Sequence, residues 1–193
     1  MKLAGTIVDR LGTRPAPSKI DTITQLSRPD TMEGVRVLLG MTAYLREHVP
    51  NYSTVVTPIS DLLRDPRNAF RGEKSRTRLL NALIEALASI PILGLPVWTE
   101  SFLLNTDASE MGGGAMLTQS IVGLEKVIAF ASKRWSRGAS LRSVTDRECM
   151  AVIWAVGEFQ PYLWGRPFTL ITDCVALIWL FKGQALSPKY HRW

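Results

Sequence analysis

Cysteine is scarce in this sequence. The 193 residues include only two cysteines, Cys149 and Cys174. Two cysteines are too few for a disulfide framework or for a zinc site built from four of them. Both stand in apolar surroundings, so we expect two buried thiols.

Long hydrophobic runs are also missing. The most apolar long window, Leu79 to Leu95, is interrupted by Asn81, Glu85 and Pro91, so it falls short of a membrane span. The first residues, MKLAGTIVDRLG, place charge inside any possible apolar region, which argues against a signal peptide. We therefore expect no membrane partner and a cytoplasmic or nuclear protein.

Acidic residues are outnumbered by basic ones. Lys and Arg total 23 against 17 Asp and Glu, which gives a net charge of +6 and a pI near 9.6. This balance favours an acidic partner such as nucleic acid. A solvated basic surface explains the same numbers equally well.

Helical spacing dominates residues 18–96. Residues 1–17 are typical of the end of a strand that enters a loop. Four short helices follow, one capped by Ser18, one running from a Thr31 cap to Pro50, one starting near Pro58 and one over Leu79–Ile90. Residues 64–78 between the last two are basic and lack periodicity, which is typical of a phosphate-facing loop or a solvated linker.

Beyond residue 96 the pattern changes to strands. Ser101 to Thr118 predicts two strands joined by a turn at Gly112–Gly114, and residues 126–132 predict a third, which makes an antiparallel meander. A basic connection, residues 133–147, leads into a helix over residues 144–162 that packs on the sheet. A fourth strand, residues 168–172, and a helix over residues 175–181 complete an α/β, or α+β, chain.

Three acids fall at corresponding places in this pattern. Asp107 and Asp173 each end a strand, and Glu148 lies on the sheet-facing side of the long helix. Like charges are costly to bring together among apolar residues unless a cation accompanies them. Oxygen ligands suit Mg²⁺ or Mn²⁺, and two such ions support phosphodiester cleavage.

Each acid also has a structural interpretation. Glu148 fits a capping box with Thr145, Asp107 fits a strand-end turn, and Asp173 fits a helix N-cap. The spacing of the residues does not decide between these interpretations and a metal site.

Several motifs resemble, in order, the ribonuclease H domain of gypsy-type LTR retrotransposon reverse transcriptases. They are LNTDASEMGGGAML, IAFASKRW, SVTDRECMAVIWAVGEFQPYLWG, FTLITDCVAL and the terminal RW. The upstream RPDTMEGVRVLLGMTAYLREHVPNYSTVVTPISDLLRD is similar to the thumb-like segment of the same polyproteins. The resemblance implies three regions, namely the end of a polymerase palm (1–17), a helical thumb or connection (18–96) and a ribonuclease H-like domain (97–193).

The resemblance also implies a mixed five-stranded sheet and cleavage of the RNA strand of RNA/DNA hybrids with two Mg²⁺ ions, Mn²⁺ being possible. Asp107, Glu148 and Asp173 match the family's metal ligands. The family's fourth acid lies downstream of the RW pair, so we expect an incomplete C-terminal part and weak or absent activity in the isolated chain. The sequence contains no Asp-Asp dipeptide, so nucleotide addition is not expected of it.

Hybrid binding requires phosphate neutralisation more than base reading. The candidates are the basic residues that precede the Glu148 helix, Lys133, Arg134, Arg137 and Arg142, although a solvated loop is the simpler interpretation. Trp135, beside two of them, is expected to be exposed, and Trp164 to be buried. The alternatives to an enzyme are a non-catalytic nucleic-acid-binding remnant and a structural support for a longer polymerase within the remainder of the Pol polyprotein.

Overall fold

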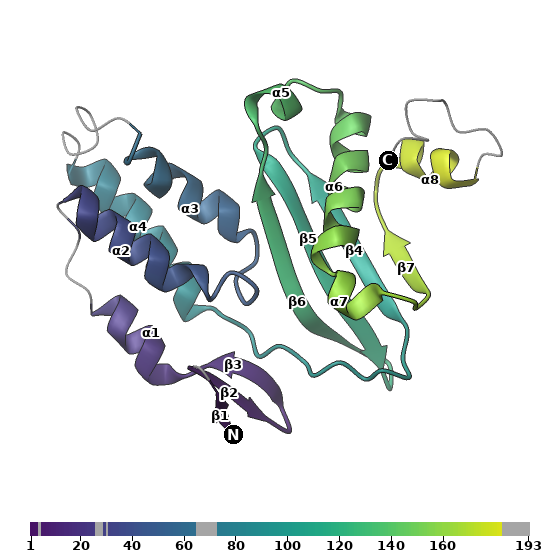
Figure 1. The fold of residues 1–193 in the computed structure, drawn as a ribbon, viewed down its shortest axis with the longest axis horizontal. Helices are drawn as coiled ribbons and strands as arrows, with labels where there is room; N and C mark the ends of the chain where they lie inside the picture. The colour runs from purple at the N-terminus through teal and green to yellow at the C-terminus, as the bar shows by residue number, and fades with distance from the viewer. Residues whose placement is uncertain (4, 26–28, 30, 65–72, 183–193) are drawn as a thin grey trace.

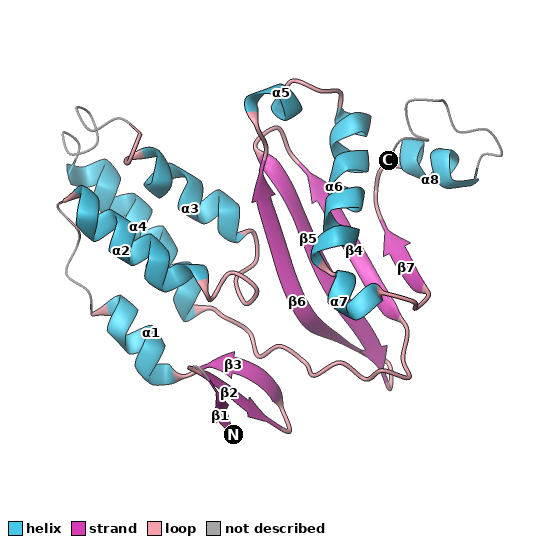
Figure 2. Cartoon of the chain, viewed as in Figure 1, coloured by secondary structure: helices cyan, strands magenta, loops and turns pink. Residues whose placement is uncertain are grey.

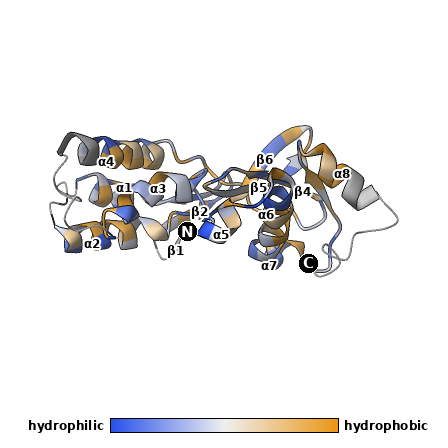
Figure 3. Cartoon of the chain, turned by 90° about the horizontal axis from the view of Figure 1, so that it is seen from above, coloured by the Kyte–Doolittle hydropathy of each residue, from blue (hydrophilic) through white to orange (hydrophobic). Residues whose placement is uncertain are grey.

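The computed structural model describes residues 1–3, 5–25, 29, 31–64 and 73–182. The helices α1–α4 lie on one side of the molecule, and a sheet with the helices α6–α8 lies on the other (Figures 1 and 3). This arrangement confirms the α/β class and the order of a helical region followed by a mixed sheet with helices.

A small antiparallel sheet opens the chain in place of the expected strand end and loop. Its strands are β1 (Lys2–Leu3), β2 (Thr6–Asp9) and β3 (Gly12–Pro15), paired in that order (Figure 2). Backbone hydrogen bonds in both directions between Thr13 and Leu93 join β3 to the segment after the last helix of the helical region. The first residues therefore contact a segment some 80 positions away, which local sequence does not reveal.

Four helices follow, α1 (Pro17–Thr24), α2 (Met32–Ala43), α3 (Tyr52–Asp61) and α4 (Glu73–Ala88). The Thr31 cap is confirmed, because its Oγ1 accepts a hydrogen bond from the Gly34 amide. The Ser18 cap is wrong, because Ala16 occupies the cap position and Pro17 begins the helix, where its missing N–H is harmless. The four helices enclose a core that includes Val35, Ile59 and Leu83.

Three helix limits differ from those expected. α2 ends at Ala43, before Pro50, and α3 begins at Tyr52 and contains Pro58 as an internal residue. Of the basic segment expected as a loop, residues 73–78 belong to α4 and residues 65–72 lie outside the described part of the chain.

The main sheet has the strand order β6-β5-β4-β7. β4 (Phe102–Ala108), β5 (Gly112–Ile121) and β6 (Leu124–Arg134) form the predicted meander, and β7 (Phe168–Ile171) pairs in parallel with β4. The sheet is mixed, as the resemblance implies, and has four strands within the described residues against the five implied.

Gly112–Gly114 lie inside β5, and the turn before it is formed by residues 109–111. The glycines are needed for packing across the sheet. A Cβ atom at Gly113 would stand 2.8 Å from the Trp135 ring, closer than carbon atoms approach in folded proteins. The predicted glycine turn is therefore wrong.

Helices cover one face of the sheet. α6 (Val144–Glu158) continues, after a break at Phe159, into the short α7 (Gln160–Leu163), so the single helix predicted over residues 144–162 is two. Ala155 and Phe159 pack against Phe102 and Leu104 of β4 in the main core. α8 (Val175–Lys182) packs beside α6 through Leu177. In the described residues, no helix is long and apolar enough to cross a membrane.

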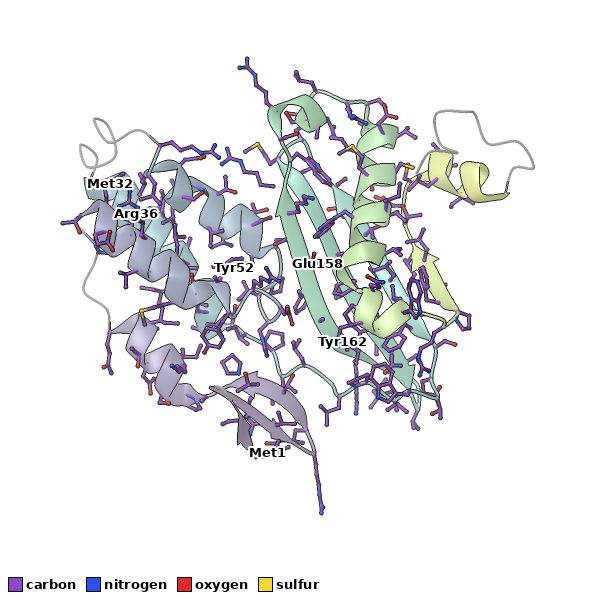
Figure 4. The ribbon with its side chains drawn as sticks, viewed as in Figure 1. Met1, Met32, Arg36, Tyr52, Glu158 and Tyr162 are labelled. Atoms are coloured by element: carbon purple, nitrogen blue, oxygen red, sulfur yellow. The ribbon has the colours of Figure 1, made fainter. Side chains whose placement is uncertain are left out.

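The helical region packs directly on the sheet. The Phe130 amide of β6 donates to the Glu47 carbonyl at 3.0 Å, and the Ser53 amide of α3 donates to Ser132 Oγ at 2.7 Å. Tyr52 of α3 and Glu158 of α6, labelled in Figure 4, line one cavity of about 240 Å³ beside β6. Edge-strand groups of β6 thus find partners in the helical region.

A buried glutamine fixes the connection between the two regions. The side chain of Gln119 is fully buried in β5. Its Oε1 accepts from the Val97 amide, and its Nε2 donates to the carbonyls of Val97 and Glu100, each at 2.9 Å. One side chain therefore replaces the backbone partners that this segment would otherwise need.

Candidate active site

Two of the predicted acids stand level with each other at the ends of neighbouring parallel strands. Asn105 of β4 is in register with Ile171 of β7, and Asp107 and Asp173 each follow two residues later. Because adjacent strands lie about 4.8 Å apart and side chains alternate between faces, this register brings both aspartates to one edge of the sheet. Both side chains are exposed.

Glu148 reaches the same edge from α6. It occupies the buried face of the helix with 4% of its surface exposed. Its Oε1 accepts a hydrogen bond of 3.2 Å from the amide of Ala108, the residue after Asp107. Its buried Oε2 has no hydrogen-bond partner among the described residues, a costly state for a carboxylate.

The environment of Glu148 raises the pKa of its carboxyl group above the ordinary value of 4.5. Burial is the largest cause. The charges of Asp107 and Asp173 raise the pKa further, whereas the Ala108 hydrogen bond and the Arg147 charge lower it. The three acids therefore act on one another electrostatically, as expected for a shared site.

The side chains are not arranged as a finished metal site. In the described part of the chain, no group of three His, Cys, Asp or Glu side chains stands close enough to hold an ion. Asp107 and Asp173 line a cavity of about 410 Å³ that Glu148 does not line. The donor set nevertheless fits Mg²⁺ or Mn²⁺, because all the donors are carboxylate oxygens and the Glu148 Oε2 atom lacks a partner among the described residues.

The structural interpretation of Glu148 as a capping-box residue is wrong. Ser143 caps α6, and its side chain accepts from the amide of Asp146. Glu148 lies beyond this turn and bonds to β4 instead. α8 begins at Val175, so Asp173 stands one residue before the cap position that its structural interpretation required.

The four predicted nucleic-acid-binding residues lie in three different surroundings. Arg137 and Arg142 are exposed around the short helix α5 (Arg137–Ser140), which lies near the end of the sheet where α6 begins (Figure 1). Lys133 of β6 is exposed and lines cavities beside Trp154 that contain none of the three acids. Arg134 is bound by an ion pair of 2.7 Å to Asp61 of α3.

Sequence reasoning missed the role of Trp135. The ring was expected to be exposed, but only 8% of its surface is, because it packs against Ala139 and Ala151. Its Nε1 donates to the Ser109 carbonyl at 3.1 Å, in the turn that follows Asp107. Trp164, expected in the core, is 77% exposed.

Arg147, immediately before Glu148, was also missed. It is a buried cation, and its Nη1 donates to the carbonyls of Ser140 and Arg142. The only sequence signal was an arginine on the apolar face of a helix, four residues before Ala151.

Comparisons with known proteins give the chain a family. A family model of the RNase H-like domain found in reverse transcriptase matches residues 97–193. The Pol polyprotein of the Drosophila melanogaster transposon 297 is 30% identical over 98% of this chain and 18% of its own length. The Tf2-3 polyprotein of Schizosaccharomyces pombe is 28% identical over 90% of this chain and 13% of its own. The chain thus spans less than a fifth of these two relatives.

Solved structures share the fold over the whole chain. The foamy viral protease-reverse transcriptase in complex with double-stranded DNA matches with a TM-score of 0.81 at 21% identity, covering 100% of this chain and 35% of that one. The same viral protein with an RNA/DNA hybrid matches with a TM-score of 0.79 at 20% identity, covering 100% and 27%. The fold is thus shared, and the family-model match over residues 97–193 shows that the chain belongs to the family of RNase H-like domains found in reverse transcriptases.

Proposed function

We propose that this chain is the ribonuclease H-like part of a retrotransposon reverse transcriptase and that it cleaves the RNA strand of RNA/DNA hybrids. The observation that carries the proposal is the buried Glu148 carboxylate, whose Oε2 atom lacks a partner among the described residues, beside the strand ends that bear Asp107 and Asp173. Membership of the family and the Pol polyprotein relatives support it.

Asp107, Glu148 and Asp173 would hold two Mg²⁺ ions, with Mn²⁺ as a possible substitute. Bound ions of this kind supply an activated water and stabilise the leaving oxygen of a phosphodiester. The side chains of the two aspartates are exposed, so each can rotate about its two side-chain bonds toward the fixed Glu148. The Ala108 amide holds Glu148 Oε1, so Oε2 would be the atom available as a metal ligand.

The substrate would be held by its phosphates. Arg137 and Arg142 are exposed on the loop that leads into the Glu148 helix, so they would contact the backbone of a hybrid whose cut strand passes the acids. Contacts to phosphate and ribose hydroxyls recognise the shape of such a duplex without reading its bases. Arg134 is engaged by Asp61, which Arg64 also contacts, so we place Arg137 and Arg142 first among the phosphate contacts.

The decisive experiment measures cleavage of a labelled RNA/DNA hybrid by the purified chain and by D107N in rising Mg²⁺ or Mn²⁺. Because the described site contributes three carboxylates, we expect slow, metal-dependent cleavage that D107N abolishes. Removing the negative charge of Asp107 is expected to leave hybrid binding equal or tighter, since the phosphates are themselves negative.

A second candidate function is hybrid binding without cleavage. It is favoured by the separation of the three carboxylates, which do not form a ready ion site among the described residues. Binding that is unaffected by D107N, with no cleavage at any metal concentration, would establish this function and overturn the proposed one.

A further inference from the structure

Arg147 is an unusual residue for the place it occupies. It lies in the first turns of α6, where the helix dipole disfavours a positive charge, and only 8% of its surface is exposed. A buried cation requires strong compensation from its surroundings. Exposed arginines of this chain, such as Arg36 on α2, need no such compensation because water solvates their charge.

Part of the compensation comes from the loop before the helix, whereas the buried Nε of Arg147 has no hydrogen-bond partner among the described residues. Arg147 Nη1 donates to the Ser140 carbonyl at 3.0 Å and to the Arg142 carbonyl at 3.1 Å. Ser140 is the last residue of α5, and carbonyls at the end of a helix have no partner within it. The guanidinium therefore closes the loop over residues 137–143 against the start of α6.

The other end of the loop is fixed by Trp135. Its backbone amide donates to the Met111 carbonyl at 2.9 Å, its indole donates to the Ser109 carbonyl, and its ring packs on Ala139. The loop is thus tied at one end to the turn after Asp107 and at the other to the residue before Glu148. The exposed Arg137 and Arg142 are carried between these two ties.

We propose that Arg147 is a positioning residue that holds the Arg137–Arg142 loop at a fixed distance from the acidic edge of the sheet. It does not contact the substrate. Phosphates engaged by the loop would then place the scissile phosphate of an RNA/DNA hybrid at Asp107 and Glu148. This step rests on the proposed function, whereas the anchoring of the loop does not.

The test compares R147M, which keeps the length of the side chain and removes its donors, with R36M, which removes one exposed charge far from the loop. Hydrogen exchange of the free protein is measured first. In R147M, we expect the amides of residues 138–143 to exchange about tenfold faster while those of residues 151–158 keep their protection. R36M is expected to match the wild type at both places.

Hybrid binding and cleavage are measured next. R147M is expected to bind the hybrid about threefold to tenfold more weakly, because loop phosphate contacts are no longer held in place. The change in cleavage is expected in KM more than in kcat, and the cut positions along the RNA should spread. A residue that only stabilised the core would lower the melting temperature without altering the distribution of cuts.

Unchanged exchange in residues 138–143, or equal loss of protection throughout α6, would overturn the anchoring role. Faster loop exchange with unchanged affinity and cut positions would overturn the positioning role. If R147M does not fold, R147K replaces it, because lysine keeps the charge but lacks the planar fork of donors, and the same outcomes decide. If the wild type neither binds nor cuts hybrid, the proposed function fails while the exchange experiment still decides on the anchor.

Discussion

Replacing Glu148 with glutamine is expected to stabilise the free protein. The glutamine side chain keeps an oxygen for the Ala108 amide and removes a buried charge whose Oε2 lacks a partner among the described residues. An unpaired buried charged group costs at least about 1–3 kcal/mol. Because the new amide nitrogen also needs a partner, we expect a gain of about 1–2 kcal/mol, which raises the melting temperature by about 2–8 °C in a chain of this length.

The gain depends on pH with a definite sign. Since the pKa of Glu148 is raised in the folded state, the folded protein binds this proton more tightly than the unfolded chain does. The free energy of unfolding of the wild type therefore falls as pH rises from the ordinary carboxyl value of 4.5 through the raised pKa. E148Q is expected to be more stable above this window and equal to the wild type below it.

Thermal unfolding with a chelator present, at neutral and at acidic pH, measures this difference. The matched control is E158Q, on the same helix, whose carboxylate is 40% exposed and lies 3.7 Å from Arg46. Such surface pairs contribute little, so E158Q should differ from the wild type by less than about 0.5 kcal/mol. E148Q that is equally or less stable at neutral pH would refute the interpretation of Glu148 as a strained, unsatisfied acid.

Three further changes test the contacts around the site. G113A is expected to lower the free energy of unfolding by about 1–3 kcal/mol because its Cβ would meet the Trp135 ring. G138A, which has open space around the new Cβ, should not lower it. Urea unfolding of the two variants measures the difference. Q119L should lower the free energy of unfolding by about 1–3 kcal/mol and speed amide exchange at Val97. Unchanged exchange there would contradict the role of the Gln119 hydrogen bonds in fixing this segment. A double-mutant cycle of R134M and D61N should give a coupling of about 0.2–1 kcal/mol with hybrid affinity unchanged, and a clear loss of affinity in R134M would return Arg134 to the substrate interface.

The position of the three acids was predictable because it depends on local patterns. An apolar run that ends in an acid indicates a strand end, and Glu148 shares a helical face with Ala151, Val152 and Ala155. The Thr31 cap was predictable for the same reason, since its partner is three residues away. The parallel pairing of β7 with β4, which the local patterns did not predict, then brings the strand ends together.

Features that depend on distant residues were not predictable. Arg134 meets Asp61, 73 positions earlier in the chain, a contact that its basic neighbours did not indicate. Gly113 is required by the Trp135 ring, which follows the end of β6, and a glycine run alone is equally typical of a turn. Trp164 follows an apolar helix yet is exposed, because α7 ends at Leu163 and leaves the core there.

At the consecutive residues Arg147 and Glu148, a local helical pattern and contacts with distant segments combine. Both charges are buried, yet the contacts of each lead to a different segment, Arg147 to the loop before α6 and Glu148 to the end of β4. A pair kept for stability alone would be better replaced by apolar side chains of similar volume. With both charges present, one turn of α6 holds two segments, namely the loop that carries Arg137 and Arg142 and the strand end that carries Asp107. A displacement of that turn therefore moves the proposed substrate contacts and the proposed metal ligands together.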